Sequence, residues 1–552
     1  MANAIRFAVF PLIISLFLSG CSDGSDRRGP EEDQGSTLLV KGAPLVGGAN
    51  GMFFDPDDRL FVGNVYGQTI SVLDPDTGEI LEQLGNPEGV QVGADDLTFD
   101  AFGTLYWTDP AAGKVMGRST EGDTFIVAEG FPLANPITVS DDGRLFFAQC
   151  FAAGSNGLFE ADPMGIMLPT TIRGEDQECS SNGMDWRDEK LFSPRWFEGR
   201  IVTVDTETGE LTDVTTNWGI PTAVKFNSLG ELHAVNQGNG EVVRIDIETG
   251  ERQVLARFPD NWLDNLAFDS NDRLFVSSAS EGTVAEVLED GEIREVIPGG
   301  MIIPMGLTLI DDVLYTTEFQ SIRGFNTQSG KQVGGFSFSY GMGPISTPTN
   351  VSSVGEYLVL LSFASNELLV WDMARESEVV KASFIFPADA APFEGDLLVS
   401  EFALGRVVRA RMPHLSERET VADGLAFPAG LAANDKDVYV SDSAQGKVFL
   451  IIRDGEVLSE PEEIAAGFDI PEGISLNSDS SKLLVVEGGS STLTEITLAT
   501  GERTIIAEEL DFQPSGSIPG LITHWINDVE VDDNDYVYVN SDGGNAIYKF
   551  PL

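Results

Sequence analysis

The stretch NGMFFDPDDRLFVGNVYGQTISVLDPDTGEILEQL, residues 50–84, contains one full copy of the unit from which this chain is built. Its four short apolar runs are separated by turns rich in Asp, Gly and Pro, which supply positive φ angles and side-chain-to-backbone hydrogen bonds. The last of these turns, residues 74–78, recurs at 205–209, 246–250 and 326–330. The pattern predicts four antiparallel β-strands joined by tight turns.

The unit recurs along the whole chain at intervals of about forty residues. Each copy has a Leu-Phe-Val-like run that begins at Leu60, Leu105, Leu145, Leu191, Leu232, Leu274, Leu314, Leu358, Leu397, Val438, Leu483 or Val537. A period of this length marks supersecondary units that bury their apolar faces only against one another. A repeated four-stranded antiparallel unit is typical of β-propeller blades.

The number of repeats predicts the domain organisation. Propellers usually hold four to eight blades, so we predict an all-β chain with two tandem six-bladed β-propellers of four-stranded antiparallel blades. We place the first at 37–299 and the second at 300–552. One twelve-bladed ring, or seven blades plus five, fits less simply. The last repeat has only three strands, and residues 37–42 could close either ring, because closure removes exposed sheet edges.

The composition excludes some classes of partner. The chain has 33 basic and 88 acidic side chains and a net charge of −55. Such a surface repels phosphate backbones and anionic lipid, so we expect no nucleic-acid partner. The acids are spread along the chain, which fits either solubility in a salty medium or a surface that attracts cations. No sequence motif indicates a nucleotide or haem cofactor.

The N-terminus has the features of an export signal. Arg6 precedes an apolar run at 7–18 that is too short to span a bilayer. The run ends in Leu-Ser-Gly-Cys, which resembles the lipobox of bacterial lipoproteins. We therefore expect a signal peptide at 1–20, acyl chains such as palmitate on Cys21, and a flexible polar tether at 21–36. The expected location is the bacterial cell envelope, at the outer membrane because Ser22 follows the cysteine. The side of the membrane stays open, and the lipid is the only expected membrane contact.

Two further cysteines, Cys150 and Cys179, remain after lipidation of Cys21. Exported proteins lie where disulfides persist. Cys150 ends the second strand of one repeat, and Cys179 precedes the next repeat on the same expected face. We predict a disulfide between them, with two free buried thiols as the alternative.

The start of each innermost strand should face the central channel of its ring. In the first ring these positions are Asn50, Asp95, Asn135, Asn182, Thr222 and Asp264. Carboxylate and amide oxygens suit a hard divalent cation, Ca²⁺ above all, so we predict metal ligands at Asn50, Asp95, Asn135, Asn182 and Asp264. The second ring offers a poorer set, Met305, Thr349, Ala388, Ala429, Glu472 and Asn527. The alternative is that these side chains only cap the turns into the strands.

The run Ser181-Asn182-Gly183-Met184-Asp185-Trp186 resembles a motif of the gluconolactonase/regucalcin family, as do residues 94–100 and 526–532. The general pattern also resembles strictosidine-synthase-like and NHL-repeat propellers. The resemblance implies a six-bladed ring with a divalent metal held by a Glu, two Asn and an Asp, which polarises a lactone carbonyl or activates water. Asn135 and Asn182 match the two asparagines. Asn50 stands where the family has Glu, and Thr222 where it has Asp.

Two hypotheses about function follow, and the sequence leaves open whether the chain is an enzyme. In the first, it is a lipid-anchored tandem propeller that binds an unidentified ligand or protein partner, with a divalent cation in the first channel. In the second, the first ring is a metal-dependent lactone or ester hydrolase acting on sugar-acid lactones, with ligands at Asp95, Asn135, Asn182 and Asp264. The departures at Asn50 and Thr222 favour the first hypothesis.

Overall fold

The computed structural model describes residues 37–41, 48–90, 93–150, 155–174, 181–259, 262–318, 320–338, 343–512 and 527–552. In these residues the chain forms twelve four-stranded antiparallel sheets. Its only helices there are the 3₁₀ turns η2 (Asn86–Glu88), η3 (Trp196–Glu198) and η4 (Phe402–Leu404). Among the described residues no helix is long and apolar enough to cross a membrane.

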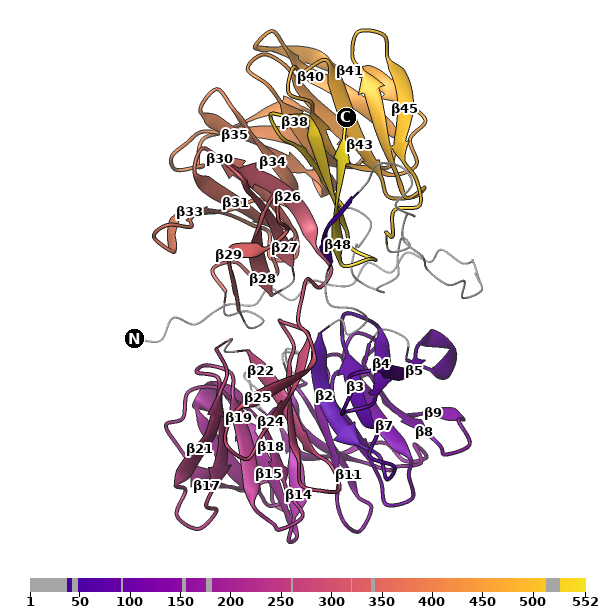
Figure 1. Cartoon of the computed structure of the whole chain (residues 1–552), viewed down its shortest axis with the longest axis vertical. Helices are drawn as coiled ribbons and strands as arrows, with labels where there is room; N and C mark the ends of the chain where they lie inside the picture. Colours follow the sequence, from indigo (N-terminus) through magenta and orange to yellow (C-terminus); the bar gives the residue numbers. More distant parts are fainter. Residues whose placement is uncertain are drawn as a thin grey trace.

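Six of the sheets form the first ring, in which β2 packs against both β6 and β22 and so closes the circle. Figure 1 shows this ring in indigo to magenta. Its blades, in chain order and from the innermost strand outward, are β2 (Ala49–Phe54), β3 (Leu60–Asn64), β4 (Thr69–Leu73), β5 (Ile80–Leu84); β6 (Leu97–Phe99), β7 (Leu105–Asp109), β8 (Lys114–Arg118), β9 (Thr124–Glu129); β10 (Ala134–Val139), β11 (Leu145–Gln149), β12 (Gly157–Ala161), β13 (Thr170–Gly174); β14 (Asp185–Arg187), β15 (Lys190–Arg195), β16 (Arg200–Val204), β17 (Leu211–Thr215); β18 (Pro221–Phe226), β19 (Leu232–Asn236), β20 (Glu241–Ile245), β21 (Arg252–Arg257); and β22 (Leu263–Phe268), β23 (Leu274–Ser278), β24 (Thr283–Val287), β25 (Ile293–Ile297).

The other six sheets form the second ring, closed by the contact of β26 with β46. The blades are β26 (Met305–Ile310), β27 (Val313–Glu318), β28 (Ser321–Asn326), β29 (Gln332–Ser337); β30 (Asn350–Val354), β31 (Tyr357–Ser362), β32 (Glu367–Asp372), β33 (Ser377–Ser383); β34 (Pro387–Phe393), β35 (Asp396–Glu401), β36 (Arg406–Ala410), β37 (Arg418–Ala422); β38 (Pro428–Ala433), β39 (Val438–Asp442), β40 (Lys447–Arg453), β41 (Glu456–Ala466); β42 (Pro471–Leu476), β43 (Lys482–Glu487), β44 (Thr492–Thr497), β45 (Glu502–Ala507); and β46 (Val529–Val531), β47 (Tyr536–Ser541), β48 (Ala546–Pro551), β1 (Thr37–Lys41). The predicted fold class is confirmed, and β1 pairs with β48, in the second ring (Figure 1).

The outer turns form as the Asp/Gly pattern predicts. In the turn after β4, the Asp74 carboxylate accepts hydrogen bonds from the backbone N–H groups of Asp76 and Thr77, at 2.9 and 3.0 Å. Gly78 closes the turn at φ +72°, a conformation that glycine adopts without steric cost. Asp205 and Asp246 make the same pair of backbone hydrogen bonds in the turns after β16 and β20.

Neighbouring blades are held together at their innermost strands by side chains that bond across the boundary. The Asp389 carboxylate accepts the backbone N–H of Ala390 in its own strand and of Leu431 in the next blade, both at 2.7 Å. Asp528 does the same for its own strand and for Leu307, and thereby closes the second ring. Hydroxyl groups of the second strand add a further bond, as when Ser441 donates to the Glu472 carbonyl at 2.6 Å.

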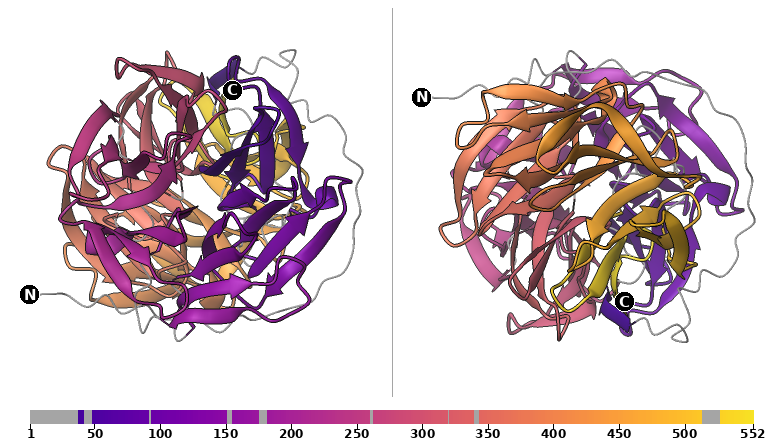
Figure 2. Two further views of the ribbon diagram at one scale, coloured as in Figure 1. Left: turned by 90° about the horizontal axis from the view of Figure 1, so that it is seen from below. Right: turned by 90° about the horizontal axis from the view of Figure 1, so that it is seen from above.

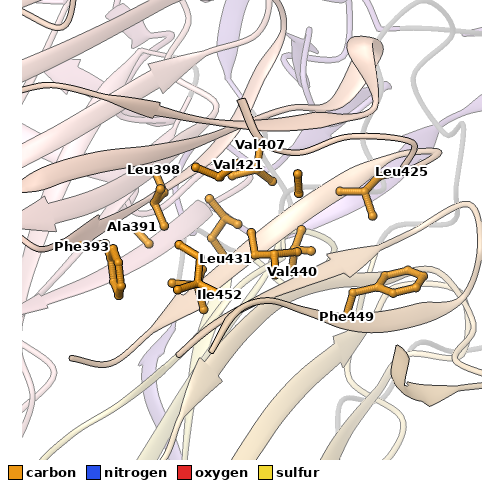
Figure 3. Close-up of a cluster of buried hydrophobic side chains, with 13 residues drawn as sticks. Ala391, Phe393, Leu398, Val407, Val421, Leu425, Leu431, Val440, Phe449 and Ile452 are labelled. Carbon is orange, nitrogen blue, oxygen red and sulfur yellow. The ribbon is translucent and has the colours of Figure 1, made fainter. Parts of the chain in front are cut away.

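The hydrophobic core is divided into layers between successive blades. Figure 3 shows one, in which Leu398 and Val407 of β35 and β36 face Leu431 and Val440 of β38 and β39. All four side chains are buried. Full burial of one such side chain contributes about 1.5–3 kcal/mol, so each blade depends on both neighbours for its stability.

The two rings stack end to end, with the starts of their innermost strands facing each other (Figures 1 and 2). Tyr66 and Ala112, in loops of the first ring, pack against an apolar cluster at the facing end of the second ring. That cluster consists of Ile302, Ile303, Met305, Phe363, Phe386, Ala388 and Phe402.

A buried charged triad joins the rings beside this cluster. Arg323 of β28 is 4 % exposed. Its Nε lies 2.6 Å from Glu318 Oε1 in the same blade, and its Nη1 lies 2.9 Å from Glu281 Oε2 in the first ring. Its Nη2 also donates to the Ser280 carbonyl at 3.3 Å. The guanidinium therefore neutralises carboxylates from both rings.

Some predictions concern residues beyond the described part of the chain. The signal peptide at 1–20, Cys21 and the tether at 21–36 all lie outside it, as does Cys179. Cys150 is disulfide-bonded, and its Sγ lies 3.4 Å from the carbonyl oxygen of Ser181.

Replacing Arg323 with Met should destabilise the protein by about 3–5 kcal/mol, because the Glu318 carboxylate would remain buried without a counter-ion. Urea unfolding followed by circular dichroism measures the change. Lys381→Met is the matched control, since Lys381 pairs with Glu367 at 2.9 Å in a partly exposed site and should cost at most about 1 kcal/mol. Equal losses in the two variants would contradict a role for the buried triad.

Candidate functional site

The predicted ligand positions of the first ring lie at the end of its channel that faces the second ring. Four of its innermost strands start with a β-bulge. One bulge lies in β18, and in the other three strands the ladder register shifts between Ala49 and Met52, between Ala134 and Ile137, and between Leu263 and Leu266. A bulge frees residues from regular pairing and re-aims their side chains. Asn50, Asn135 and Asp264 fall in these three bulges.

The structure brings three of the predicted residues into one hydrogen-bonded cluster. Asn50 Nδ2 donates to Asp95 Oδ1 at 3.0 Å, and Asn135 Nδ2 donates to Asp95 Oδ2 at 3.1 Å. Asp95 is 9 % exposed. The Oδ1 atom of Asn50 is buried and has no hydrogen-bond partner within the described residues. We call Asn50, Asp95 and Asn135 the rim cluster.

Asp264 belongs to the same electrostatic environment. Burial, with a smaller contribution from Asp96, raises the pKa of Asp264 from 3.8 to about 7. Burial also raises the pKa of Asp95 well above its ordinary value, and the charges of Asp264 and Asp96 raise it further. Asp264 can therefore exchange a proton near neutral pH, next to a second carboxyl group whose pKa is also raised.

The other two strand starts are occupied by local bonds. Asn182 is buried, and its Oδ1 accepts the N–H of Gly183 at 2.9 Å. The Thr222 hydroxyl donates to the Leu263 carbonyl at 3.0 Å, which ties β18 to β22. Among the described residues, no three His, Cys, Asp or Glu side chains are grouped to hold a metal ion. The oxygen atoms of the rim cluster and Asp264 are nevertheless of the kind that a hard cation binds.

The sequence reasoning missed a buried ion network deeper in the same channel. Lys225 of β18 is 5 % exposed, and its ammonium group donates to the Met184 carbonyl at 3.3 Å and lies 5.4 Å from the ring of Phe53. Its charge counteracts the effect of burial, which raises the pKa of both Asp96 and Asp185. A lysine between Val224 and Phe226 in an apolar innermost strand was the available signal.

Asp96, the residue after Asp95, caps strand starts and is not part of the rim cluster. Its carboxylate accepts the N–H groups of Leu97 at 2.9 Å and Ile137 at 3.1 Å, and the side-chain amide of Asn265 at 3.1 Å. These bonds join three blades. Gly51 is required here, because a Cβ atom at that position would lie 2.4 Å from the Asp96 Cα.

The chain has partial similarity to known proteins. No protein-family model matches the chain. Regucalcin from Danio rerio is 27 % identical over 217 residues, which cover 33 % of this chain and 73 % of regucalcin. A streptogramin B lyase structure aligns with a TM-score of 0.37 at 19 % identity, over 51 % of this chain and 93 % of that one. The extracellular domain of BT4673 from B. thetaiotaomicron aligns with a TM-score of 0.32 at 10 % identity, over 94 % and 82 %.

The raised pKa of Asp264 predicts a pH-dependent effect of Asp264→Asn. The folded state keeps this proton up to a pH of about 7, whereas the unfolded chain loses it near 3.8. Asp264 therefore stabilises the folded state fully below pH 3.8, and this contribution is lost as the pH rises through about 7. The Asn variant has no such loss, so its melting temperature relative to the wild type should increase as the pH rises from about 4 to 8.

Melting curves across this pH range measure the difference. Asp205→Asn is the control, because backbone hydrogen bonds lower the pKa of Asp205, so its replacement should bring no gain at higher pH. A constant difference between the wild type and Asp264→Asn at all pH values would contradict the assignment.

Proposed function

We propose that this protein is a lipid-anchored tandem β-propeller of the gluconolactonase-like type, which binds a ligand or partner at the rim of the first ring, between its two propellers. The observation that carries this proposal is the Oδ1 atom of Asn50. It is a buried acceptor without a partner in the described structure, next to the buried carboxylate of Asp95. A buried acceptor without a hydrogen-bond partner destabilises the folded state by about 1–3 kcal/mol unless a ligand binds it.

A divalent cation fits the chemistry of this donor set. The rim cluster and Asp264 supply carboxylate and amide oxygens, the ligands that Ca²⁺ prefers. Both amides now turn their nitrogen atoms to Asp95, so cation binding would require them to present oxygen instead. A bound cation would lower the pKa values of Asp95 and Asp264 and would act as a Lewis acid on a neighbouring ligand.

The proposed location follows from the sequence. The export signal and the Leu-Ser-Gly-Cys motif support attachment of the mature chain by a lipid on Cys21, with the propellers on a tether. The net charge of −55 favours cationic over anionic partners and disfavours nucleic acid. The partial similarity to regucalcin supports the choice of family type.

Cation binding at the rim should raise the melting temperature of the full chain. Thermal melts are compared in a chelator and after addition of Ca²⁺, Mg²⁺, Mn²⁺ or Zn²⁺. A specific site at a hundred times its Kd adds about 2.7 kcal/mol of stability. The shift should disappear in Asp95→Asn and persist in Asp205→Asn, which removes one charge from an exposed turn. No shift with any of the four ions would contradict a cation at the rim.

A second candidate function is hydrolysis of lactones or esters at the same rim. The observation that favours it is the pair of carboxyl groups with raised pKa values, Asp95 and Asp264. Strongly perturbed carboxyls in a channel are common at catalytic sites. One could accept a proton from water while the other donates a proton to the leaving oxygen.

This candidate predicts turnover of sugar-acid lactones by the full chain. Release of acid, followed with a pH indicator, measures the reaction. Asp264→Asn should lower the rate by about 10²–10⁴-fold, the typical contribution of a general acid or base, and Asp205→Asn should leave it unchanged. Absence of hydrolysis across lactones and simple esters would contradict this candidate and leave ligand binding as the proposed function.

A further inference from the structure

The central channel of the second ring contains a cavity of about 270 Å³ that the rim of the first ring does not share. All six innermost strands of this ring, β26, β30, β34, β38, β42 and β46, contribute to its wall. The strands begin at the inter-ring face, and the cavity extends to their far ends, where Pro392 is exposed. The cavity therefore opens on the side away from the first ring.

The strand register shows which residues leave room for the cavity in the second ring. Phe226 of β18 pairs with Leu232, and Leu476 of β42 pairs with Leu483, so Lys225 and Ser475 occupy the same position in the fifth blade of each ring. In the first ring that position carries a buried ammonium group. In the second ring it carries a short hydroxyl side chain that lines the cavity.

The two rings also differ in the residues at this same position of other innermost strands. Phe53 and Asp185 lie beside Lys225 in the first channel. Each stands one residue before the residue that pairs with the first leucine of the repeat's second strand, Leu60 or Leu191. The counterparts of Phe53 and Asp185 in the second ring are the smaller residues Thr308 and Ala432, and both line its cavity. At these blades the second ring thus has the smaller side chain, whereas at the sixth blade Glu530 stands where the first ring has Ala267.

The cavity wall is acidic and has no cation of its own. Asp389, Asp528 and Glu530 line it, and the lining residues include no Lys, Arg or His among those that the structure describes. Burial raises the pKa of Asp528 to about 7 and that of Glu530 to about 8. It also raises the pKa of Asp389 well above its ordinary value, with a contribution from the charge of Asp528. In the first ring burial raises the pKa values of Asp96 and Asp185, and the Lys225 charge offsets part of this rise.

One further polar side chain of the wall is available to a ligand. Thr308 of β26 is 1 % exposed and lines the cavity. Its hydroxyl makes no hydrogen bond with any residue in the described ranges, whereas Ser475 donates to Glu530 at 3.4 Å. Because Thr308 lines the cavity, a ligand held there could bond to this hydroxyl.

We propose that the second channel is a binding site for the primary ammonium group of a small organic amine, which enters from the face away from the first ring. The carboxylates of Asp389, Asp528 and Glu530 accept hydrogen bonds from the ammonium group, and the Thr308 hydroxyl accepts another. The alkyl part of the ligand lies against Ala391 and Ala432 toward the mouth. The bound amine takes the place that the Lys225 ammonium holds in the first ring.

An ammonium group suits this wall better than a metal ion. Among the described residues no three carboxylates are grouped closely enough for metal coordination. Asp389 and Asp528 also bind backbone N–H groups with both oxygens. An ammonium group has three N–H donors, which can be shared among separated acceptors.

Calorimetry of the full chain with n-butylammonium chloride tests the proposal, with n-butanol as the neutral comparator. We expect saturable binding of one n-butylammonium per chain and none of n-butanol. Glu530→Gln should weaken binding by about tenfold or more, as expected for loss of a charge-assisted hydrogen bond. Asp95→Asn, in the other ring, should leave the affinity unchanged, which separates this site from the rim of the first ring.

Ser475→Lys provides the sharpest variant, because it places in the second ring the lysine that the first ring already contains. It should abolish n-butylammonium binding and raise the ligand-free melting temperature, whereas Ser475→Met, of similar length but uncharged, should abolish binding without that rise. Absence of saturable binding to the wild type would overturn the proposal. So would equal binding of n-butanol, unchanged affinity in Ser475→Lys, or binding of Ca²⁺ that Glu530→Gln removes while n-butylammonium does not bind.

Discussion

The carboxylate at the start of an innermost strand is the interaction on which the rest of this structure depends. In the described residues blades share no β-ladder with their neighbours, so buried side chains and single backbone bonds, such as Gly51 N–H to the Asp95 carbonyl at 2.7 Å, hold the boundaries. Asp96, Asp389 and Asp528 each accept one N–H from their own strand and one from the next blade. Each bond involves a buried charge in a region of low dielectric, where a satisfied network is rigid and a broken one is costly. Everything that faces either channel is positioned by these bonds.

The cost of burying these carboxylates is met differently in the two rings. In the first, Lys225 supplies a positive charge from the chain itself, and the ring of Phe53 lies beside it. In the second, serine and alanine stand at the same layer, and the acids line an open cavity. The two rings share one architecture, but a few side chains of one layer separate a filled channel from a channel that can accept a ligand. Fold similarity alone therefore says little about the chemistry of either ring.

The stacking of the rings places the candidate site of the first ring in a distinct environment. Its rim faces the second ring, and contacts through Tyr66, Ala112 and the Arg323 triad hold the rings together beside it. A ligand at the rim would thus lie between two propellers instead of on an open face. The second cavity opens on the opposite side, so the molecule presents two separate sites of different character.

The sequence by itself determined the strands, the turns and the two rings, because a period of about forty residues and its Asp/Gly turns are local features that need no knowledge of distant contacts. It also located Asn50, Asp95, Asn135 and Asp264 at strand starts. Only the tertiary structure decided that Asn50 and Asn135 bind Asp95 while Asn182 bonds to its own backbone, because the direction of each side chain depends on bulges and on the neighbouring blade. The second channel escaped sequence reasoning for the same reason. Its acids come from strands that are distant in the chain, and the cavity exists because small residues from several blades meet in one layer.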